Sequence, residues 1–296
     1  MNLLKKLKDY SIYLIAKNGW LNFLSDSTYI RLMYFLHMGR ILNLRNPQTF
    51  NEKIQWLKLY NRQSEYPIMV DKYAVKKWVA EKIGEKYVIP TLGVWDKFDD
   101  IDFDKLPNKF VLKCTHDSGG LVVVKDKKFF DVAVARKKIN ASLKRNFYYV
   151  GREWPYKSVP PRIIAEQYLA GAVGDVVDYK VHCFNGKARF VLTCSERFSE
   201  TGLKEDFYDL SWNRMPVARP DHSNSEKGIP KPKTFAKMID FAESFAKGIP
   251  FLRVDFYEVD AKLYFGEFTF FPASGLNAFV PKSWDETFGS WLNISV

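Results

Sequence analysis

Two acidic residues near the C-terminus stand in an otherwise apolar stretch, where they could bind a metal ion. The stretch RVDFYEVDAKLYFGEFTF alternates apolar and polar residues on both sides of DAK, as the strands of a β-hairpin do. If DAK forms a three-residue loop, Asp255 lies directly opposite Glu267 on the neighbouring strand. Arg253 then lies opposite Thr269, and the period of two places all four side chains on one face.

Two facing carboxylates favour a bound cation, because they would otherwise repel each other. Oxygen ligands with few other donors suit Mg²⁺, which keeps several waters and takes further ligands from substrate phosphates. In the alternative arrangement, Glu267 pairs with Arg253 while Asp255 faces the solvent. A two-residue loop would favour this alternative, because it would stagger the two acids. The sequence therefore predicts either a Mg²⁺ site or an ion pair on this hairpin.

A second stretch, FVLKCTHDSGGLVVV, contains groups that bind phosphate. Lys113 lies within an apolar strand, where its charge is costly unless an anion lies close by. The turn that follows contains Ser118, Gly119 and Gly120 and can expose backbone N–H groups to an anion. It is not a Walker A loop, since neither GKS nor GKT follows. The two features together predict a phosphate site, and an ordinary SGG hairpin turn is the alternative.

A third stretch, RIIAEQYLAGAVGDVVDYKVHCFNGK, places polar residues beside an apolar core. The segment from Glu166 to Leu169 is expected where an edge strand leaves that core, so its backbone groups could pair with the edge of an adenine. Asp178, Lys180 and His182 share one face of the next strand. For these three residues, a solvated sheet face is the alternative.

The elements that position these residues change character along the chain. Thr49 and Glu52 have the spacing of a capping box, and VDKYAVKKWVAEKIG has the apolar stripe of a helix. Short β-branched runs and helical stretches then alternate without a long repeat. We therefore expect an α+β protein with a helical N-terminal region (residues 1–83), a segment with the first strands (84–168) and a C-terminal part (169–296).

Composition narrows the classes of function. The 296 residues are 47% hydrophobic, enough for a substantial core, and carry a formal net charge of +11, which favours an anionic partner. The lysines are dispersed and no nucleic-acid-binding motif occurs, so we expect no nucleic-acid partner. Three cysteines without CxxC spacing indicate buried free thiols, and four scattered histidines predict no zinc site.

The N-terminus has lysines within its apolar run and no small-residue cleavage site, so we read no secretion signal there. No stretch approaches the roughly 18 to 20 apolar residues of a membrane-spanning helix. These features predict a cytoplasmic protein. Lys5, Lys6 and Lys8 beside leucines leave open an N-terminal helix that touches the inner face of the membrane peripherally, and a helix packed on its own protein is the alternative.

Taken in order, these stretches resemble the ATP-grasp superfamily: a strand lysine, a glycine-rich loop, a Glu-x-x-Leu segment, then RVDFY and GEFTF. More narrowly, NPQTFNEKIQWLKLY, DKYAVKKWVAEKIGEKYVIPTLG, FVLKCTHDSGG, DYKVHCFNG and RVDFYEVDAKLYFGEFTFFPASG resemble the TupA-like (teichuronopeptide-biosynthesis) ATP-grasp family of bacterial cell-surface polysaccharide loci. The resemblance extends over roughly residues 45–290. It implies two α+β subdomains that grip ATP, the smaller within 84–168 and the one with the metal site within 169–296.

The resemblance implies nucleotide contacts for residues singled out above. Lys113 would contact the phosphates, and the loop from His116 to Gly120 would close over them. Asp117, where many relatives have glycine, would add a negative charge close to these phosphates. Glu166 and Leu169 would flank the adenine. The implied nucleotide-binding set is Lys113, His116, Ser118, Gly119, Gly120, Glu166, Gln167, Leu169, Asp178 and Lys180.

The resemblance also implies metal-binding and catalytic residues. Asp255 and Glu267 would hold Mg²⁺, with Thr269 as a further ligand at the position where many ATP-grasp enzymes have asparagine. Arg253 and Lys113 would be the catalytic residues, with Arg253 steadying the transferred phosphoryl group. The cofactors implied are ATP and Mg²⁺.

The implied activity is ATP-dependent formation of an amide. Hydroxide is a poor leaving group, so phosphoryl transfer from ATP would convert a carboxylate into an acyl phosphate, which an amine then attacks. No protein nucleophile is needed, in keeping with the absence of a Ser/His/Asp constellation. By resemblance, the acid is a uronic acid of a capsule or related glycan, which is an anionic sugar, and the amine is a small one.

Two other functions stay open. A glycosyltransferase of a polysaccharide locus usually carries a DxD metal motif, and Asp100 and Asp102 have this spacing within a stretch that reads as a surface loop. A non-catalytic protein that binds glycans or a membrane surface is the third possibility. Mg²⁺-dependent release of ADP would separate the ligase from both.

Overall fold

The computed structural model describes most of the chain, which forms two compact units. The described residues are Ile12, Leu14, 18–169, 176–196, Ser199 and 202–294. Unit 1 comprises Met1–Arg62, Tyr149–Arg152 and Gly171–Val296, and unit 2 comprises Gln63–Tyr148 and Glu153–Ala170. The boundaries expected from the sequence, after residues 83 and 168, stay a prediction.

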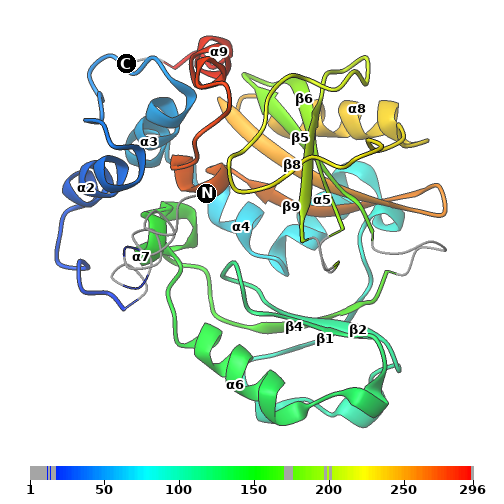
Figure 1. Cartoon of the computed structure of the whole chain (residues 1–296). Helices are drawn as coiled ribbons and strands as arrows, with labels where there is room; N and C mark the ends of the chain where they lie inside the picture. The colour runs from blue at the N-terminus through cyan, green and yellow to red at the C-terminus, as the bar shows by residue number, and fades with distance from the viewer. Residues whose placement is uncertain are drawn as a thin grey trace. The chain divides into compact units, whose positions relative to one another are not determined.

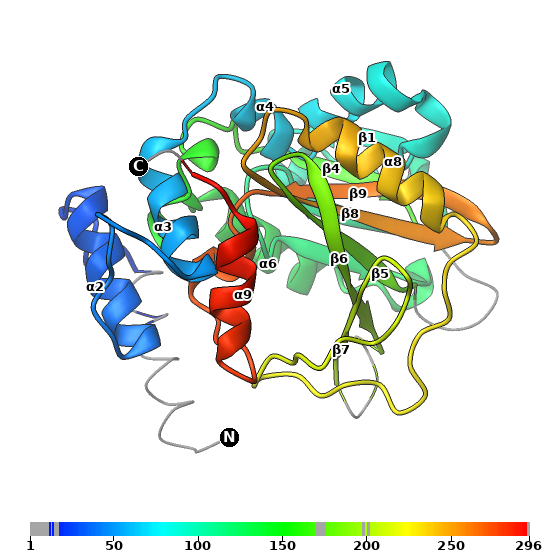
Figure 2. The ribbon, with the colours of Figure 1, turned by 90° about the horizontal axis from the view of Figure 1, so that it is seen from above.

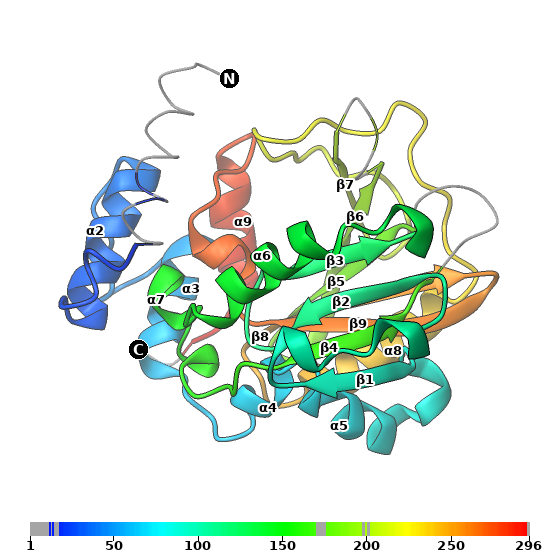
Figure 3. The ribbon, with the colours of Figure 1, turned by 90° about the horizontal axis from the view of Figure 1, so that it is seen from below.

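Among its described residues, unit 2 (cyan to green in Figure 1) contains a four-stranded antiparallel sheet with the strand order β1-β4-β2-β3 (Figure 3). The strands are β1 (Thr91–Trp95), β2 (Phe110–Cys114), β3 (Leu121–Val124) and β4 (Ile163–Gln167). The helices are α4 (Tyr66–Val70), α5 (Ala74–Ile83) and α6 (Val132–Leu143), with short 3-10 helices at Glu85–Tyr87, Phe98–Asp100, Phe103–Lys105, Lys127–Phe129 and Trp154–Tyr156. Helix α6 packs on β2 and β3, as Figure 3 shows.

The alternation of β2 decides where Lys113 lies. Phe110, Leu112 and Cys114 are buried in one hydrophobic cluster together with Ile139 of α6. Lys113 is half-buried and points to the opposite face, because successive side chains of a strand alternate. This hydrophobic cluster of unit 2 thus lies on one face of the sheet, and Lys113 and Glu166 lie on the other.

The described part of unit 1 contains a five-stranded antiparallel sheet with the order β7-β6-β5-β8-β9. The strands are β5 (Asp178–Phe184), β6 (Lys187–Ser195), β7 (Lys204–Tyr208), β8 (Phe251–Val259) and β9 (Lys262–Thr269). The helices are α2 (Asp26–Met38), α3 (Phe50–Tyr60), α8 (Phe235–Ala246) and α9 (Ser283–Trp291), and η6 (Pro272–Gly275) is a 3-10 turn. Helix α7 (Tyr148–Gly151) lies where the chain passes from unit 2 back into unit 1. Helix α8 covers one face of the sheet, and α3 packs against α9 (Figure 2).

The start of α3 follows the capping box expected from the sequence. The Thr49 hydroxyl accepts a hydrogen bond from the Glu52 backbone N–H at 3.3 Å, and the Glu52 carboxylate accepts one from the Thr49 N–H at 3.2 Å. Phe50, the first residue of α3, packs its ring against those of Phe184 and Phe251. Local capping and aromatic packing together fix α3 against the sheet of unit 1.

The hairpin of β8 and β9 differs from expectation in its turn. Val259 pairs with Lys262, so Asp260 and Ala261 form a two-residue turn with φ values of 51° and 59°. Both φ values are positive, as in the type I′ turns that match the twist of paired strands. The predicted three-residue loop is therefore wrong.

A bulge at Gly266 nevertheless restores the predicted pairing. Phe256 pairs with Phe265, but the preceding residue, Asp255, pairs with Glu267, so Gly266 is the extra residue on β9. Beyond this shift, Arg253 pairs with Thr269. A Cβ atom at position 266 would lie 3.0 Å from the Asp255 carbonyl oxygen, so glycine allows the two backbones to approach closely. The two-residue turn alone would have staggered the acids, and the extra residue of the bulge cancels that stagger.

Two further expectations concern cysteines and the membrane. Cys114, Cys183 and Cys194 are free and buried, as predicted. Across the described ranges, no helix combines the length and apolar character needed to cross a membrane. The N-terminal lysines Lys5, Lys6 and Lys8 lie outside the described residues.

Candidate active site

In unit 2, two lysines bind one buried glutamate. The Lys113 ammonium lies 2.5 Å from one oxygen of Glu166, and the Lys76 ammonium lies 2.6 Å from the other. Glu166 is 5% exposed. Burial by itself would raise the pKa of Glu166, but the charges of Lys113 and Lys76 lower it to about 2. The cluster therefore brings two ammonium groups to one ionised carboxylate.

Lys76 is a residue that sequence reasoning missed. It lies on α5, where it also donates a hydrogen bond to the Ile89 carbonyl oxygen at 2.6 Å. Burial and the nearby Lys113 lower its pKa, and Glu166 opposes that shift. A signal was present: Lys76, Val79 and Ile83 have the i, i+3, i+7 spacing of one helix face, so this lysine belongs to an apolar stripe.

The glycine loop of unit 2 is organised by Asp117. Its carboxylate accepts hydrogen bonds from Arg145 at 2.5 Å, from the Gly120 N–H at 3.2 Å and from the Ser142 hydroxyl. Burial raises the pKa of Asp117, but Ser142 and Arg145 outweigh it and the net shift is downward. The negative charge of Asp117 is therefore neutralised by Arg145, which follows α6 in the sequence. The sequence alone suggested an added negative charge beside the phosphates.

The predicted residues of this loop divide into a buried and an exposed group. His116 is buried, with Nε2 3.2 Å from the Ser142 carbonyl oxygen, and Gly120 is buried because a Cβ there would collide with Ser142 and Cys114. Ser118 and Gly119 are exposed at the tip, and Gly119 has a φ of +131° that favours glycine. At the tip, backbone N–H groups are accessible to a ligand.

The adenine segment is not at an edge strand. Glu166 and Gln167 belong to β4, which pairs with β1 on one side and β2 on the other. Gln167 is exposed, and its N–H donates to the Pro90 carbonyl oxygen at 3.0 Å. Leu169 lies half-buried beyond the end of the strand. The edge-strand expectation is wrong because β1 covers β4, and the adenine contact stays a prediction.

In unit 1, Asp255 is the counterpart of Glu166. It is 1% exposed, and Arg253 binds it with two hydrogen bonds of 2.7 Å while the Lys180 ammonium lies 2.5 Å away. Lys180 also lies 3.6 Å from Asp178. Burial raises the pKa of Asp255, but Arg253 and Lys180 outweigh it, so the carboxyl group is ionised. The alternative in which Asp255 faces the solvent is wrong, because the side chain is buried against Arg253 and Lys180.

The second carboxylate of the hairpin is more open. The Glu267 side chain is 42% exposed, and one oxygen lies 3.3 Å from Arg253. Thr269, opposite Arg253, is half-buried. No cluster of three or more His, Cys, Asp or Glu side chains capable of holding a metal occurs in the part of the chain that the structure describes. An ionised, buried aspartate directly opposite an accessible glutamate is nevertheless a donor set that fits Mg²⁺, provided that phosphates and waters complete the coordination.

His182 lies on the same face of the sheet, opposite Arg253. It is 5% exposed, its Nδ1 lies 2.9 Å from the Lys180 carbonyl oxygen and its ring stacks on Phe190 at 4.2 Å. Burial, aided by the charge of Arg253, lowers its pKa to about 3. The ring is therefore neutral at physiological pH. Asp178 is likewise buried, so the solvated sheet face considered for these residues is wrong.

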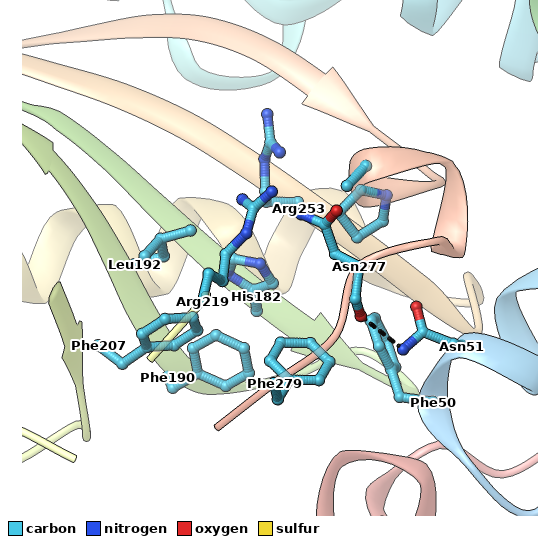
Figure 4. A pocket seen from close by; sticks show the side chains of 12 residues that line it. Phe50, Asn51, His182, Phe190, Leu192, Phe207, Arg219, Arg253, Asn277 and Phe279 are labelled. Carbon is cyan, nitrogen blue, oxygen red and sulfur yellow. Dashed lines mark hydrogen bonds between the residues drawn. The ribbon is translucent and has the colours of Figure 1, made fainter. Parts of the chain in front are cut away.

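A pocket opens on this face of unit 1 (Figure 4). Arg253 and His182 line it, together with Arg219 and Asn277 from segments outside the strands. The rings of Phe190, Phe207 and Phe279 lie along its other side. Sequence reasoning missed Arg219, because it lies in the irregular stretch VARPDHSN, where no periodicity marks which residues turn inward.

The turn η6, which also lines the pocket, is held by α3. Ala273 and Ser274 have φ values of 46° and 56°, which are strained for residues other than glycine. Gln55 donates to the carbonyl oxygen of Ser274 at 2.9 Å and to that of Gly275 at 2.7 Å. Lys58, which is 1% exposed, donates to the Ser274 carbonyl oxygen at 2.7 Å. One face of α3 thus fixes the carbonyl groups of the turn.

The DxD-like pair of unit 2 does not form a site. Asp100 and Asp102 are exposed, and Asp102 lies 3.1 Å from Lys105 in a local ion pair. Its side chain also accepts a hydrogen bond from the Asp104 N–H. These contacts agree with the surface loop expected from the sequence.

Comparison with solved structures returns ATP-grasp enzymes at low sequence identity. D-alanine–D-alanine ligase from Bacillus anthracis in complex with ATP is 18% identical, with a TM-score of 0.38, over 68% of this chain and 53% of the other. D-alanine–D-alanine ligase from Helicobacter pylori is 11% identical, with a TM-score of 0.44, over 84% and 68%. The ATP-grasp ligase PsnB with minimal precursor, Mg and ADP is 7% identical, with a TM-score of 0.38, over 74% and 57%. The chain thus spans little more than half the length of the first and third of these enzymes.

No curated protein matches the sequence. Residues 52–293, however, match the family described as TupA-like ATP-grasp. This match covers most of the chain and includes both the lysine cluster of unit 2 and the carboxylate pair of unit 1, so the family resemblance found in the sequence motifs is confirmed. The chain belongs to the TupA-like ATP-grasp family, and its α+β fold is the ATP-grasp fold.

Proposed function

We propose that this protein is an ATP- and Mg²⁺-dependent ligase that joins a carboxylate to an amine through an acyl phosphate. The observation that carries the proposal is the pairing of Asp255 with Glu267, with Arg253 bound to both, in a chain of the ATP-grasp family. Mg²⁺ held by the two carboxylates would offset charge on the phosphate oxygens during transfer.

The side chains of each unit have distinct roles in this proposal. In unit 2, Lys113 and Lys76 bind the phosphates, and Glu166 keeps both ammonium groups in position. In unit 1, Lys180 helps to keep Asp255 ionised, and Arg253 steadies the phosphoryl group. The exposed tip of the glycine loop contributes backbone N–H groups.

No covalent intermediate on the protein is required. Burial raises the pKa of the Cys114 thiol to about 11 and that of Cys194 to about 12, so neither forms the thiolate that a nucleophile needs. His182 has a pKa of about 3 and does not transfer protons at neutral pH. Phosphoryl transfer and attack by an amine need only positioning and charge, which the clusters of lysine, arginine and carboxylate provide.

We further propose that the acid is a uronic acid of a capsule or another bacterial cell-surface polysaccharide, and that the amine is a small one such as an amino acid. The resemblance of the sequence motifs implies teichuronopeptide biosynthesis, and a net charge of +11 favours an anionic glycan. Because the reaction consumes ATP, the proposal places it in the cytoplasm, where the sugar would be nucleotide-linked, lipid-linked or part of a polymer.

The test is release of ADP and phosphate from Mg-ATP by the purified protein, with uronic acids and uronate oligosaccharides screened against a panel of amines. We expect release that needs both partners and a product that mass spectrometry finds one water lighter than their sum. ATP binding without any coupled product in the screen would remove the uronic acid from the proposal. Failure to bind Mg-ATP under any condition would overturn the ligase itself.

A further inference from the structure

The pocket of unit 1 carries polar groups that the proposed phosphate chemistry does not use. Arg219 is the principal one, and its position is fixed by the fold. The preceding residue, Ala218, exchanges backbone hydrogen bonds of 2.9 and 2.8 Å with Val280. This bridge brings the irregular segment after β7 back to the polypeptide that follows η6. Arg219 therefore enters the pocket from a fixed backbone position.

The guanidinium of Arg219 is held so that part of it faces the pocket. Its Nη1 donates to Glu205 of β7 at 3.2 Å. With the Asn277 amide oriented so that its oxygen faces Arg219, this oxygen accepts from Nε at 2.8 Å and also from Nη2. One N–H of Nη1 and one of Nη2 make no hydrogen bond within the described residues, and the side chain is 20% exposed. Two neighbouring N–H donors of this kind match the two oxygens of a carboxylate.

Arg253 offers a second donor edge to the same pocket. Its Nε and Nη2 bind Asp255, and Nη2 also binds Glu267. Its Nη1 has no hydrogen-bond partner among the residues described. Arg253 therefore links the two sites, since one edge contacts the carboxylate pair and another edge faces the pocket. An acid bound between Arg219 and Arg253 would lie next to the group that activates it.

His182 adds an acceptor to these donors. The Lys180 carbonyl oxygen accepts from Nδ1, so the neutral ring carries its proton there and leaves a lone pair on Nε2. No group in the described chain donates to Nε2, and the residue lines the pocket (Figure 4). A lone pair in this position accepts from a hydroxyl group and repels a second carboxylate. The pocket is therefore equipped for an acid that also carries hydroxyl groups.

Aromatic rings complete the pocket. Phe190, Phe207 and Phe279 line the side away from the two guanidinium groups, as Figure 4 shows. Apolar and aromatic walls with a few placed polar groups are typical of small-molecule sites. A ligand whose chemistry complements this lining has one apolar face, several hydroxyl groups and one carboxylate, as a pyranose sugar acid does.

We propose that this pocket binds the uronic acid substrate, with Arg219 and Arg253 holding its carboxylate and His182 accepting a hydrogen bond from a ring hydroxyl. The inference rests on the proposed ligase function and deepens it by assigning Arg219 as the residue that selects a carboxylated sugar. Arg219 touches the substrate but not the nucleotide, so its loss separates recognition of the acid from use of ATP.

The test is binding of D-glucuronate and D-galacturonate to the full chain, measured by calorimetry and ligand-observed NMR with MgCl₂ and a non-hydrolysable ATP analogue. D-glucose, which lacks the carboxylate, and acetate, which lacks the ring, are the matched ligands. We expect at least one uronate to bind about 10-fold or more tightly than both. Arg219→Gln should weaken uronate binding by about 30-fold, as expected when one partner of a buried charged pair is lost, and should leave binding of the analogue unchanged.

Two further variants distinguish a local loss of uronate binding from misfolding of the protein. Arg219→Lys keeps the charge near Glu205 but loses the planar fork, so we expect an intermediate loss of uronate binding. Arg189→Gln is the matched control, because Arg189 is an exposed arginine of β6 next to Phe190 that does not line the pocket. It should bind both ligands as the parent does.

The outcomes distinguish this proposal from the proposed function. Binding of the ATP analogue without preference for a uronate, or full uronate affinity in Arg219→Gln, would overturn the pocket assignment and leave the ligase intact. Equal affinity for acetate would show that the ring is not recognised and would also overturn it. Loss of analogue binding in the parent protein would count against the ligase function instead.

Discussion

The two units each bury a carboxylate between two cations, but the cluster of unit 1 contains further carboxylates. In unit 2, the ammonium groups of Lys76 and Lys113 bind the same carboxylate, that of Glu166. In unit 1, Arg253 and Lys180 lie among three carboxylates, which are those of Asp178, Asp255 and Glu267. The same local motif therefore favours an anion in one unit and a cation in the other, as a phosphate site and a Mg²⁺ site require.

The largest effect is expected at Asp255. Asp255→Asn leaves Arg253 and Lys180 without their shared charge partner, and removing one member of a buried ion pair costs about 3–5 kcal/mol of stability. We also expect Mg-ATP turnover to fall by about 10³-fold or more, because the metal loses its buried ligand. Chemical denaturation and steady-state ADP release measure the two effects.

Glu267→Gln is the matched comparison on the neighbouring strand. Its side chain is 42% exposed, so stability should change by less than about 1 kcal/mol, while turnover should fall as in Asp255→Asn. Normal Mg²⁺-dependent nucleotide binding in both variants would show that unit 1 is not the metal site.

Lys113→Ala tests the positive site of unit 2. Loss of one phosphate contact should lower turnover by about 10²- to 10³-fold. Lys76 still neutralises Glu166, so the protein should stay folded. Lys109→Ala is the control, since Lys109 is exposed and lies one residue before β2. Equal turnover in the two variants would remove Lys113 from the phosphate site.

Acid should affect the two units over different pH ranges. The pKa of His182 is lowered from 6.5 to about 3 by burial, so unit 1 loses stability once the pH falls below about 6.5, where the unfolded chain binds the proton first. Glu166 has its pKa lowered from 4.5 to about 2, so its stabilisation of unit 2 is complete above pH 4.5 and is lost as the pH falls toward 2.

Amide hydrogen exchange from pH 7 to pH 4.5, corrected for intrinsic rates, measures this difference. We expect peptides of β5 and β8 to lose protection while those of β2 and β4 keep it. His182→Leu should remove the loss in unit 1. Earlier loss in unit 2 would contradict the assigned charge states.

The smallest effect on turnover is expected at the bulge. Gly266→Ala places a Cβ atom 3.0 Å from the Asp255 carbonyl oxygen, so β9 must shift locally. We expect a loss of about 1–2 kcal/mol of stability, typical of overpacking at a close contact, and a several-fold weaker dependence of turnover on Mg²⁺. If Mg²⁺ dependence is unchanged, the alignment of Asp255 with Glu267 does not depend on the bulge.

The sequence predicted what short-range periodicity controls. Lys113 lies within a strand, as expected, and alternation correctly put Arg253, Asp255, Glu267 and Thr269 on one face of a hairpin. The pairing was correct although the predicted turn was wrong, because the bulge compensates for one residue. Whether a bulge forms depends on contacts between two paired strands. The sequence alone shows only a glycine within a strand, so it does not reveal the bulge.

The partners of the charged groups were harder to predict, because they come from distant elements. Lys76 reaches Glu166 from a helix, and Arg219 reaches the pocket from an irregular segment held by the bridge at Ala218. Asp117 showed the reverse: a charge expected near phosphates is balanced by Arg145 of the same unit. Tertiary packing decides such pairings, and neither period two nor period 3.6 encodes them.

The hydrogen bonds from α3 to the η6 turn have a consequence for domain exchange within the family. Asn51, Gln55 and Lys58 recur at one-turn intervals and bind successive carbonyl groups between Ser274 and Asn277. A chimaera that joined the strands of this chain to the N-terminal helices of a relative would combine a strained turn with a helix not matched to it. The unit that recombination must preserve is therefore α3 together with the pocket wall, although more than 200 residues of sequence separate them.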